Sequence, residues 1–259
     1  MINLSLENKN FYVAIDFDRT ITSADGVDSW AAVAQTRYVG QEIVKEMDEL
    51  YAKYRPIEMD YSISKNDKEK YMKKWYEDCM DLYYKYNLTK HKMLQSIQNS
   101  NMIFRSGAKE FLKLMYKNDI PVIVLSAGIG NAIEQFLKDN NCLFENMYII
   151  SNFIEFAENG KAKKFDNSKI IHTLNKNMKG HLPKGFEEKL SNKEYRLLIG
   201  DLIEDIKMVD ESELNKTLKI GILDINIENN IDIYKKYFDL VIQGEDATFY
   251  QIIKLVFAL

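Results

Sequence analysis

The sequence predicts an α/β protein in which an all-helical segment interrupts a mostly parallel β-sheet after its first strand. Short runs that are apolar at every position alternate with helical patterns, which is typical of parallel strands buried on both faces. The interval 23–105 contains no convincing run of this kind. The expected strands cover residues 11–16, 120–125, 147–150, 195–199, 218–223 and 240–242.

The interval 23–105 is therefore expected to form helices. Its apolar periodicity predicts a helix over 31–54. Asn66 with Glu69 resembles a capping box, which predicts the start of a second helix, and a third is expected after Thr89.

The remaining helical patterns belong with the sheet. Ser106 is a candidate N-cap for the first of them, and residues 130–140, 170–174 and 246–257 each present an apolar face. Because the first strand is separated from the others, the sheet domain is discontinuous in sequence. The predicted domains are a core over 1–22 and 106–259 and a helical cap over 23–105.

The composition is that of an ordinary globular protein, and it argues against two classes of partner. Of the 259 residues, 46% are hydrophobic and 29% are charged, and the formal net charge is -4. Lysines are interleaved with acidic residues, so we expect no basic stripe that would bind a nucleic-acid backbone. No apolar run approaches the ~20 residues needed to span a membrane, and the N-terminus shows no signal-peptide pattern.

Cys79 and Cys142 are the two cysteines of the chain, and they lie far apart in the sequence. They form neither a metal-binding spacing nor a disulfide framework, which favours a reducing compartment. The cytoplasm is the expected location. The sequence carries no signal for an oligomeric state.

Polar side chains follow three of the expected strands where each strand ends. Asp16 and Asp18 end the first, Ser126 ends the second, and Asp201 ends the strand over 195–199. In open α/β sheets, ligands bind outside the carboxyl ends of the strands. We therefore expect these side chains to converge on one site.

The acids in this set predict a cation. Asp16 and Asp18 are two residues apart at a strand end, so their carboxylates can face one site. Two carboxylates at such a short distance repel each other unless a positive charge lies between them. Asp201 adds a third. Oxygen ligands suit Mg²⁺, whereas zinc is disfavoured because no His or Cys accompanies these motifs.

Other residues near the strand ends could hold phosphate oxygens. Thr20 and Ser126 offer hydroxyl groups, and Gly128, after Ala127, allows the main chain to approach a ligand closely. Asp205 lies one helical turn after Asp201 and could share its side of a helix. It could equally be an acid stabilised by the helix dipole.

These motifs resemble the haloacid dehalogenase superfamily of phosphohydrolases. The matching segments, in order, are Asp16-Phe-Asp-Arg-Thr20, Ser126-Ala-Gly128, a lysine, and Gly200-Asp201 with Asp205. The resemblance implies a three-layer, Rossmann-like core and an inserted cap that excludes water from the site. It implies that Asp16 attacks phosphorus, that Asp18 is the general acid and base, and that Mg²⁺ is the cofactor.

Further segments resemble the pyrimidine 5′-nucleotidases, the type III cytosolic 5′-nucleotidase family. They are Tyr54-Arg-Pro-Ile-Glu58, Met72-Lys-Lys-Trp75-Tyr76, Ser126-Ala-Gly-Ile-Gly130, Ser151-Asn-Phe153, Ile171-His172 with Asn175-Lys176, and Lys219-Ile-Gly-Ile-Leu223. This closer resemblance covers most of the chain. It implies a nucleoside monophosphate as substrate.

The same resemblance implies roles for several residues. Lys176 would bind phosphate, Glu58 would contact the edge of the base, and Trp75 and Tyr76 would form the wall of the base pocket, with Cys79 nearby. Composition alone favours a solvated lysine on a helix for Lys176, and periodicity alone favours core positions for the aromatic pair. A small buried thiol is the simpler interpretation of Cys79.

The metal site implied by the resemblance contains Asp16, Asp201 and the backbone carbonyl of Asp18. Asp205 is expected there too, orienting either Lys176 or a metal-bound water. In this last motif the family usually has a serine and a glycine between the two aspartates. In this sequence Leu202 stands in place of the serine and Glu204 in place of the glycine.

The expected function is Mg²⁺-dependent hydrolysis of nucleoside 5′-monophosphates through an aspartyl-phosphate. The partner is thus a small phosphate ester. Two alternatives remain open from the sequence. One is a phosphatase for phosphoserine or a sugar phosphate, and the other is a phospho-accepting switch without turnover.

Overall fold

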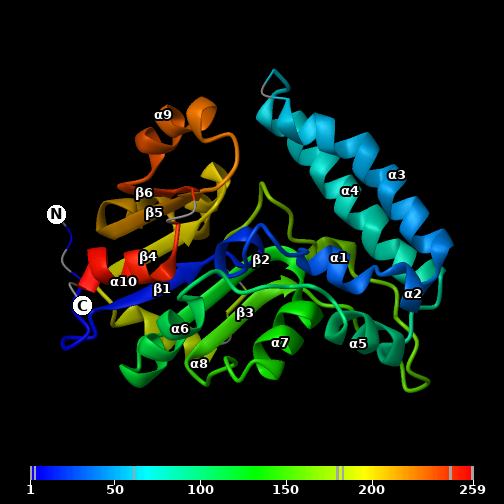
Figure 1. Cartoon of the computed structure of the whole chain (residues 1–259), viewed down its shortest axis with the longest axis horizontal. Helices are drawn as coiled ribbons and strands as arrows, with labels where there is room; N and C mark the ends of the chain where they lie inside the picture. The colour runs from blue at the N-terminus through cyan, green and yellow to red at the C-terminus, as the bar shows by residue number, and fades with distance from the viewer. Residues whose placement is uncertain are drawn as a thin grey trace.

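The protein forms one six-stranded parallel sheet with helices on both faces (Figure 1). The computed structural model describes residues 2, 4–60, 62–178, 181–182, 184–244 and 247–257. The strand order is β3-β2-β1-β4-β5-β6, and neighbouring strands pair in parallel. The strands are β1 (Phe11–Ile15), β2 (Val122–Ile129), β3 (Met147–Asn152), β4 (Tyr195–Gly200), β5 (Thr217–Leu223) and β6 (Leu240–Gln243).

All six expected strands are present, and the central strands are buried on both faces, whereas the edge strands β3 and β6 are partly exposed. Every residue of β1 and β2 is buried. β1 lies in the middle of the sheet, and its odd-numbered residues pack on one face while Tyr12 and Ala14 pack on the other. This alternation gives the protein one apolar core on each side of the sheet.

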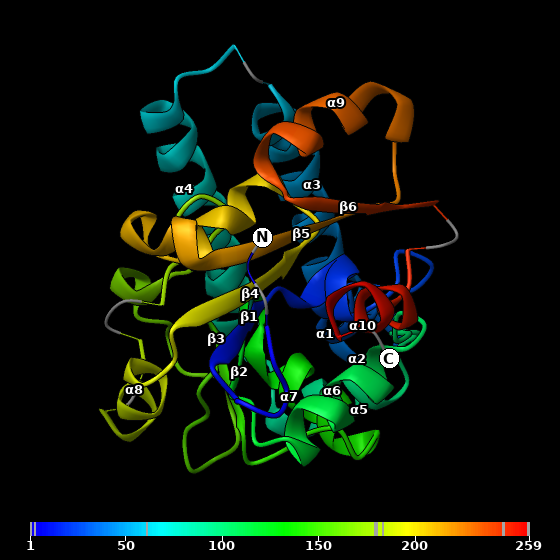
Figure 2. The same ribbon diagram turned by 90° about the vertical axis from the view of Figure 1, so that its left-hand side faces the viewer.

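Three layers follow from these two cores. α6 (Ala108–Lys117), α7 (Gly130–Asp139) and α10 (Phe249–Phe257) pack on the face that carries Val13 and Ile15. α8 (Lys184–Ser191) and α9 (Ile227–Tyr237) pack on the opposite face. Figure 2 shows α6, α7 and α10 to one side of the sheet and α8 to the other. The predicted three-layer α/β fold is therefore confirmed.

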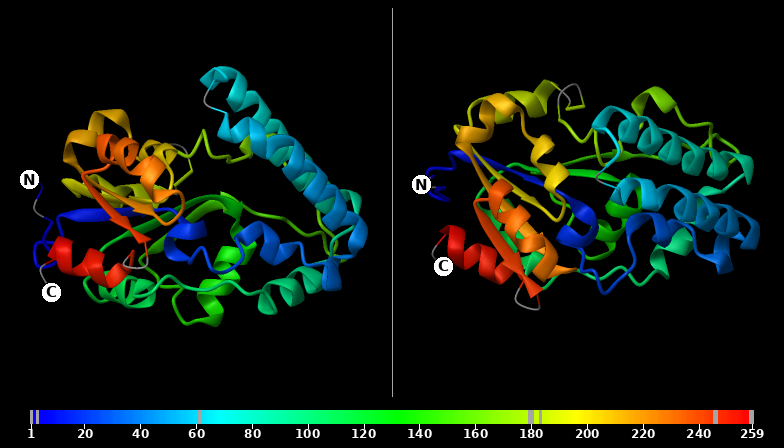
Figure 3. Two further views of the ribbon diagram at one scale, coloured as in Figure 1. Left: turned by 45° about the horizontal axis from the view of Figure 1, so that its top comes forward. Right: turned by 90° about the horizontal axis from the view of Figure 1, so that it is seen from above.

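Among the described residues, five α-helices lie within the interval 23–105, where the sequence predicts a helical segment but only three helices. α1, α2 and α5 lie against one another, and α1 and α5 also contact α7. The two long helices are α3 and α4. They form an antiparallel pair that extends beyond the carboxyl ends of the strands (Figures 1 and 3). The five are α1 (Ser29–Val33), α2 (Thr36–Val39), α3 (Gln41–Met59), α4 (Lys65–Lys85) and α5 (Lys90–Gln98).

The two segments that connect these helices to the sheet run side by side. Thr22 and Phe104 form an antiparallel bridge, the amide of Ser23 donates to the carbonyl of Ile103 at 2.8 Å, and the amide of Arg105 donates to Ile21 at 2.9 Å. The chain thus leaves and re-enters the core at one place. We retain 23–105 as the proposed bounds of the cap.

Three predicted helix starts or bounds in this part of the chain are wrong. The helix expected over 31–54 is divided into α1, α2 and α3, and Gly40, with φ of 102°, precedes α3. α4 begins after Ser64, whose hydroxyl accepts from the amide of Asp67, so Asn66 is not its cap. Gly107, at φ 78°, occupies the N-cap of α6 in place of Ser106.

The helix start expected after Thr89 is confirmed, since the Thr89 hydroxyl caps α5. Residues 170–174 were expected to be helical, and they form a loop in the structure. The last expected helix is α10, which begins at Phe249, and Asp246 lies outside the described residues.

Candidate active site

Three carboxylates meet at the carboxyl edge of the sheet. Asp16 follows β1, Asp201 follows β4, and Asp205 lies in the short 3-10 helix η3 (Ile203–Met208). One oxygen from each lies within 4.8 Å of the others. Parallel pairing of β1 with β4 explains this convergence, because it brings the ends of both strands to the same edge.

Lys176 binds two of these acids from a loop on the other side of the site. Its Nζ lies 2.5 Å from Oδ1 of Asp16 and 2.8 Å from Oδ1 of Asp205. The lysine side chain is only 4% exposed, so the alternative of a solvated helix-face lysine is wrong. Burial opposes its charge, but Asp16 and Asp205 outweigh burial and raise the pKa of Lys176 well above its usual value.

The second oxygen of Asp205 is also engaged. Oδ2 accepts from the backbone amide of Leu202 at 3.0 Å, while Oδ1 binds Lys176. Asp205 is fully buried, and a carboxylate with both oxygens bound is fixed in position. It therefore orients the Lys176 ammonium towards Asp16.

The acid cluster carries more negative charge than Lys176 balances. Burial raises the pKa of Asp16 to about 6, although Lys176 lowers it. Burial, Asp16 and Asp205 together raise the pKa of Asp201 well above its usual value. A site of buried, mutually repelling carboxylate oxygens fits a hard divalent cation such as Mg²⁺.

Asp18 lies beside this cluster and is held by a residue that sequence motifs did not single out. The amide of Ser29 donates to Oδ1 of Asp18 at 2.8 Å, and the Ser29 hydroxyl donates to Oδ2 at 2.5 Å. Burial, followed by the charge of Asp28, raises the pKa of Asp18 to about 7. The carboxyl group therefore has a fixed orientation and can exchange a proton near neutral pH.

Gly128 leaves the space that this arrangement needs. A Cβ at this position would lie 2.0 Å from Oγ of Ser29 and 2.5 Å from Oδ2 of Asp18. The Gly128 amide donates to the buried Oγ of Ser126 at 3.0 Å, and the amide of Ile129 donates to Oγ of Ser29 at 3.1 Å, so the end of β2 binds the serine that holds Asp18. A larger residue would separate them.

The remaining expected phosphate-binding residues are also at this edge. The hydroxyl of Thr20 lies 3.5 Å from Oδ1 of Asp201. The carbonyl of Ala127 accepts from Nε1 of Trp30 at 3.2 Å and from Nδ2 of Asn152 at 3.0 Å. Ala127 is thus held through its backbone, which fixes the irregular end of β2 that carries Ser126.

Buried amide side chains shape the loop that delivers Lys176. Asn152, at the end of β3, exchanges hydrogen bonds of 2.8 and 2.9 Å with the backbone of Ile171. Asn175 accepts from the amide of His172 at 2.7 Å. Burial lowers the pKa of His172 to about 4, so its ring is neutral. These bonds replace the helix that periodicity predicted.

The helical insertion contributes Glu58 to the site. Glu58 lies near the end of α3 and forms an ion pair with Arg55 through Oε2. Its other oxygen accepts from the hydroxyl of Thr173 at 3.3 Å. Because Thr173 precedes Lys176 in the same loop, this contact connects the long helical pair with the core beside the acids.

Trp75 and Tyr76 lie in an aromatic cluster behind Glu58. The Trp75 ring stacks on Tyr54 at 6.0 Å and meets Tyr76 edge-on at 5.7 Å. Both residues are partly buried, and Tyr76 packs against the apolar core, as its periodicity predicts. Cys79 is buried, and burial raises its pKa to about 12, so it is the inert thiol that the simpler interpretation predicted.

Trp30 joins this aromatic cluster to the core, and it too went unrecognised in the sequence. Its ring meets Tyr76 edge-on at 5.5 Å and stacks on Tyr83 at 6.4 Å. Its Nε1 binds Ala127, as described above. A lone tryptophan in a short helix carries no motif, so sequence inspection offered no signal for this contact.

A cavity of about 290 Å³ lies between the long helical pair and the carboxyl ends of β4 and β5. Arg55 and Glu58 line it from the helical pair, and Asp201 lines it from the core. Leu202 and Glu204, the two departures from the family pattern, line it as well. Trp75, Tyr76 and Cys79 are not among its lining residues, so the aromatic pair stands behind this cavity.

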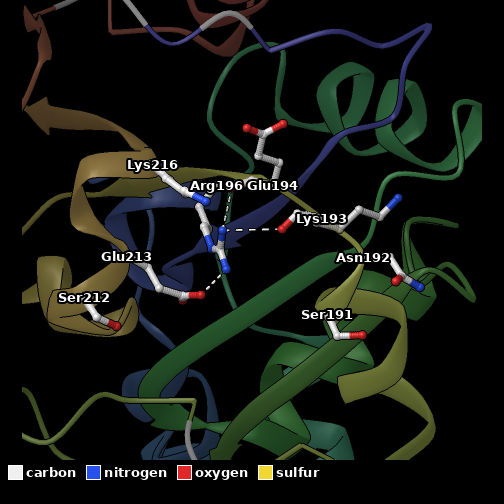
Figure 4. Close-up of a pocket in the computed structure, with 8 residues that line it drawn as sticks. All are labelled: Ser191, Asn192, Lys193, Glu194, Arg196, Ser212, Glu213 and Lys216. Carbon is white, nitrogen blue, oxygen red and sulfur yellow. Dashed lines mark hydrogen bonds and ion pairs between the residues drawn. The ribbon is translucent and has the colours of Figure 1, made fainter.

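A second cavity, of about 500 Å³, lies at the opposite edge of the sheet, where β4 and β5 begin (Figure 4). Its central residue is Arg196, which forms an ion pair with Glu213 and donates to the carbonyls of Lys193 and Glu194. The acids and Lys176 are absent from its lining. This cavity is therefore separate from the phosphate chemistry.

Within the described residues, the helices are too short or too polar for any of them to span a bilayer.

Comparisons with known proteins agree with the geometry. Residues 19–258 match the pyrimidine 5′-nucleotidase (UMPH-1) family. The 7-methylguanosine phosphate-specific 5′-nucleotidase of Homo sapiens is 30% identical over 241 residues, which are 91% of this chain and 80% of that protein. The Drosophila melanogaster protein of the same description is 28% identical over 243 residues, which are 91% and 76% of the two chains.

Solved structures show the same relationship. Cytosolic 5′-nucleotidase IIIB bound to cytidine has a TM-score of 0.82 and 28% identity, and the match covers 96% of this chain and 85% of that one. A substrate-bound phosphoserine phosphatase shares the fold, with a TM-score of 0.60 and 18% identity over 95% and 98% of the two chains. The chain therefore belongs to the pyrimidine 5′-nucleotidase family, and it is a phosphohydrolase with the haloacid dehalogenase fold.

Proposed function

We propose that this enzyme is a Mg²⁺-dependent nucleoside 5′-monophosphatase in which Asp16 is the nucleophile. The observation that carries the proposal is the buried contact between Asp16 and Lys176 beside Asp201. The names of relatives support the substrate class, since they specify 7-methylguanosine phosphate and a complex with cytidine.

The residues at the site suit two successive transfers of the phosphoryl group. An Asp16 oxygen attacks phosphorus and forms an aspartyl-phosphate as the bond to the sugar oxygen breaks. Asp18 gives its proton to that leaving oxygen. Asp18 then takes a proton from water, whose oxygen attacks phosphorus and releases inorganic phosphate and free Asp16.

Positive and polar groups stabilise the phosphoryl oxygens during both steps. Lys176, Thr20, Ser126 and the amide of Gly128 are the groups available at the carboxyl edge. Phosphoryl transfer depends mainly on positioning and on electrostatic stabilisation, so these contacts would supply most of the rate increase.

Asp16, Asp201 and the backbone carbonyl of Asp18 would hold Mg²⁺. When bound, the ion neutralises charge on the acids and on the phosphate. Asp205 was expected at the metal site, and its two engaged oxygens favour the role of orienting Lys176.

Base recognition is assigned to Glu58, with Trp75 and Tyr76 as aromatic support. Glu58 supports this assignment because it lines the cavity next to Asp201. A carboxylate accepts hydrogen bonds from ring or amino N–H groups of a base. The helical insertion would act as a cap that limits access of bulk water.

A substrate panel tests the proposed function. The panel contains pyrimidine, purine and 7-methylguanosine monophosphates, phosphoserine and sugar phosphates, and turnover is measured by release of inorganic phosphate. With Mg²⁺ present, we expect one of the nucleoside monophosphates to have the highest kcat/KM of the panel. Phosphoserine and sugar phosphates should be poorer substrates, and chelation of Mg²⁺ should stop turnover. A preference for phosphoserine would contradict the assigned substrate class.

Replacing Glu58 with alanine should reduce kcat/KM for a nucleotide while sparing p-nitrophenyl phosphate, which has no base. The loss should be about 10- to 100-fold, because a hydrogen bond to a charged group contributes about 1.5–3 kcal/mol. Glu204→Ala is the matched control, since it removes a carboxylate from the same cavity. Equal losses on both substrates would remove Glu58 from base recognition.

A further inference from the structure

Arg105 is a buried arginine at the point where the chain returns from the helical insertion to the core. It is 6% exposed. Its Nε donates to the carbonyl of Thr20 at 3.0 Å, and Nη2 donates to that of Arg19 at 2.5 Å. Nη1 donates to the carbonyl of Ala247 at 3.0 Å, and both Nη atoms bind Asp224, at 3.2 and 2.6 Å. All five guanidinium N–H groups thus have an acceptor.

Two of these bonds determine the path of the loop that carries Asp18. Arg19 adopts a φ of 62°, which is uncommon for a residue with a side chain. Such a conformation costs free energy and persists only where surrounding contacts enforce it. Arg105 supplies part of that enforcement, because it binds the carbonyls of the two peptide groups that follow the Arg19 Cα, those of Arg19 and Thr20. The amide of Arg19 is held separately, by Oγ1 of Thr22 at 3.0 Å.

The hydrogen bonds from Arg105 also fix the direction of the peptide dipoles in this loop. The carbonyl oxygens of Arg19 and Thr20 are directed at Arg105, so their negative dipole ends face a cation. Because both peptide bonds are trans and planar, the N–H group that follows each carbonyl points away from Arg105. The loop therefore keeps its carbonyls paired instead of leaving them free to approach an anionic substrate.

Asp224 anchors the guanidinium. It follows β5 directly, accepts two hydrogen bonds from Arg105 and lines the 290 Å³ cavity. A buried arginine without a carboxylate partner is strongly destabilising, so the pair behaves as one unit. This unit links the end of β5, the junction with the insertion and the loop between Asp16 and Ile21.

We propose that Arg105 is a positioning residue for phosphoryl transfer, with Asp224 as its anchor. It contacts none of Asp16, Asp201 or Lys176, and it acts through the backbone of Arg19 and Thr20. Its role is to keep the Asp18 carboxyl and the Thr20 hydroxyl in the places that the chemistry needs. This inference rests on the proposed role of Asp18 as the acid that protonates the leaving oxygen.

Leaving-group dependence distinguishes positioning from a general loss of folded protein. Phenyl phosphate needs protonation of its leaving oxygen more than p-nitrophenyl phosphate does, because p-nitrophenolate is the more stable anion. If Arg105 positions Asp18, its loss should affect phenyl phosphate more. A smaller fraction of folded enzyme would lower both rates equally.

The experiment compares Arg105→Lys with Arg196→Lys. Arg196 is a fair control because it is 9% exposed, forms an ion pair with Glu213 and lies at the opposite edge of the sheet (Figure 4). We expect Arg105→Lys to lower kcat/KM for phenyl phosphate, which reports the transfer of the phosphoryl group to Asp16, by about 10²-fold, the cost of a displacement of roughly 1 Å at a reacting group. The loss on p-nitrophenyl phosphate should be several-fold smaller, and Arg196→Lys should keep the wild-type ratio of the two rates.

Asp224→Asn provides a second test that does not depend on the lysine variant being soluble. It keeps the shape of the anchor and removes its charge, so we expect a smaller loss with the same dependence on leaving group. Equal losses on both aryl phosphates, or losses no greater than in Arg196→Lys, would overturn the proposal. A wrong nucleotide assignment would appear instead in the wild-type substrate panel and would leave this comparison intact.

Discussion

Replacing Asp16 with asparagine should reduce turnover of every phosphate ester by roughly 10⁴-fold or more, the scale seen when a covalent nucleophile is removed. An amide nitrogen or oxygen at this position cannot form the aspartyl-phosphate. The fold should survive, because Lys176 keeps its bond to Asp205 and the buried cluster loses one of its repelling charges. Steady-state phosphate release and thermal unfolding measure the two effects.

Peptide mapping after acid quenching adds a direct control for this variant. In the wild-type enzyme, phosphate should be found on the peptide that contains Asp16, and it should be absent from that peptide in Asp16→Asn. Near-normal turnover by the variant in the presence of Mg²⁺ would show that another group attacks phosphorus.

Replacing Gly128 with alanine should cause the second large loss. The added methyl group would lie 2.0 Å from Oγ of Ser29 and 2.5 Å from Oδ2 of Asp18, so the hydrogen-bonded pair must move apart. We expect kcat to fall by at least about 10²-fold from displacement of the acid. The free energy of unfolding should fall by about 1–3 kcal/mol, as is usual for overpacking.

Gly185→Ala is the matched control for this substitution. Gly185 lies in α8, and a Cβ there would have no heavy atom within 4 Å. Alanine is the better helix former, so this variant should be as stable as wild type or slightly more so, with unchanged kcat. If Gly128→Ala also kept wild-type kcat, the close approach of Gly128 to Asp18 would be irrelevant to the reaction.

The sheet was predictable because its strands are buried on both faces. β1, β2 and β4 are runs of apolar residues, and this composition distinguishes them from the helices around them. The helix boundaries were less predictable, since several capping patterns compete locally. Ser64 and Asn66 are both good N-cap residues, and in the structure the Ser64 hydroxyl accepts from the amide of Asp67 and caps the helix.

The acids of the site were predictable because each follows a strand. Their partners were not, because Ser29 and Trp30 lie in a five-residue helix and Arg105 lies in a connecting segment, and neither carries a motif. The loop before Lys176 was mistaken for a helix, since Ile170 and Ile171 lie four and three residues before Leu174, which is helical spacing. Hydrogen bonds from Asn152 and Asn175, which are tertiary features, determine its actual path.

The helical insertion contacts the core in two different places. One contact holds residues of the proposed chemistry, and the other holds the residue proposed to bind the base. α1 brings Ser29 and Trp30 into hydrogen bonds with Asp18 and Ala127, so it is tied to the sheet. Glu58 is carried on the outlying helical pair and meets the core through Thr173. Under the proposed role of Glu58 in base recognition, mutations in that pair would alter substrate choice over evolutionary time while Asp16, Asp18 and Lys176 remain unchanged.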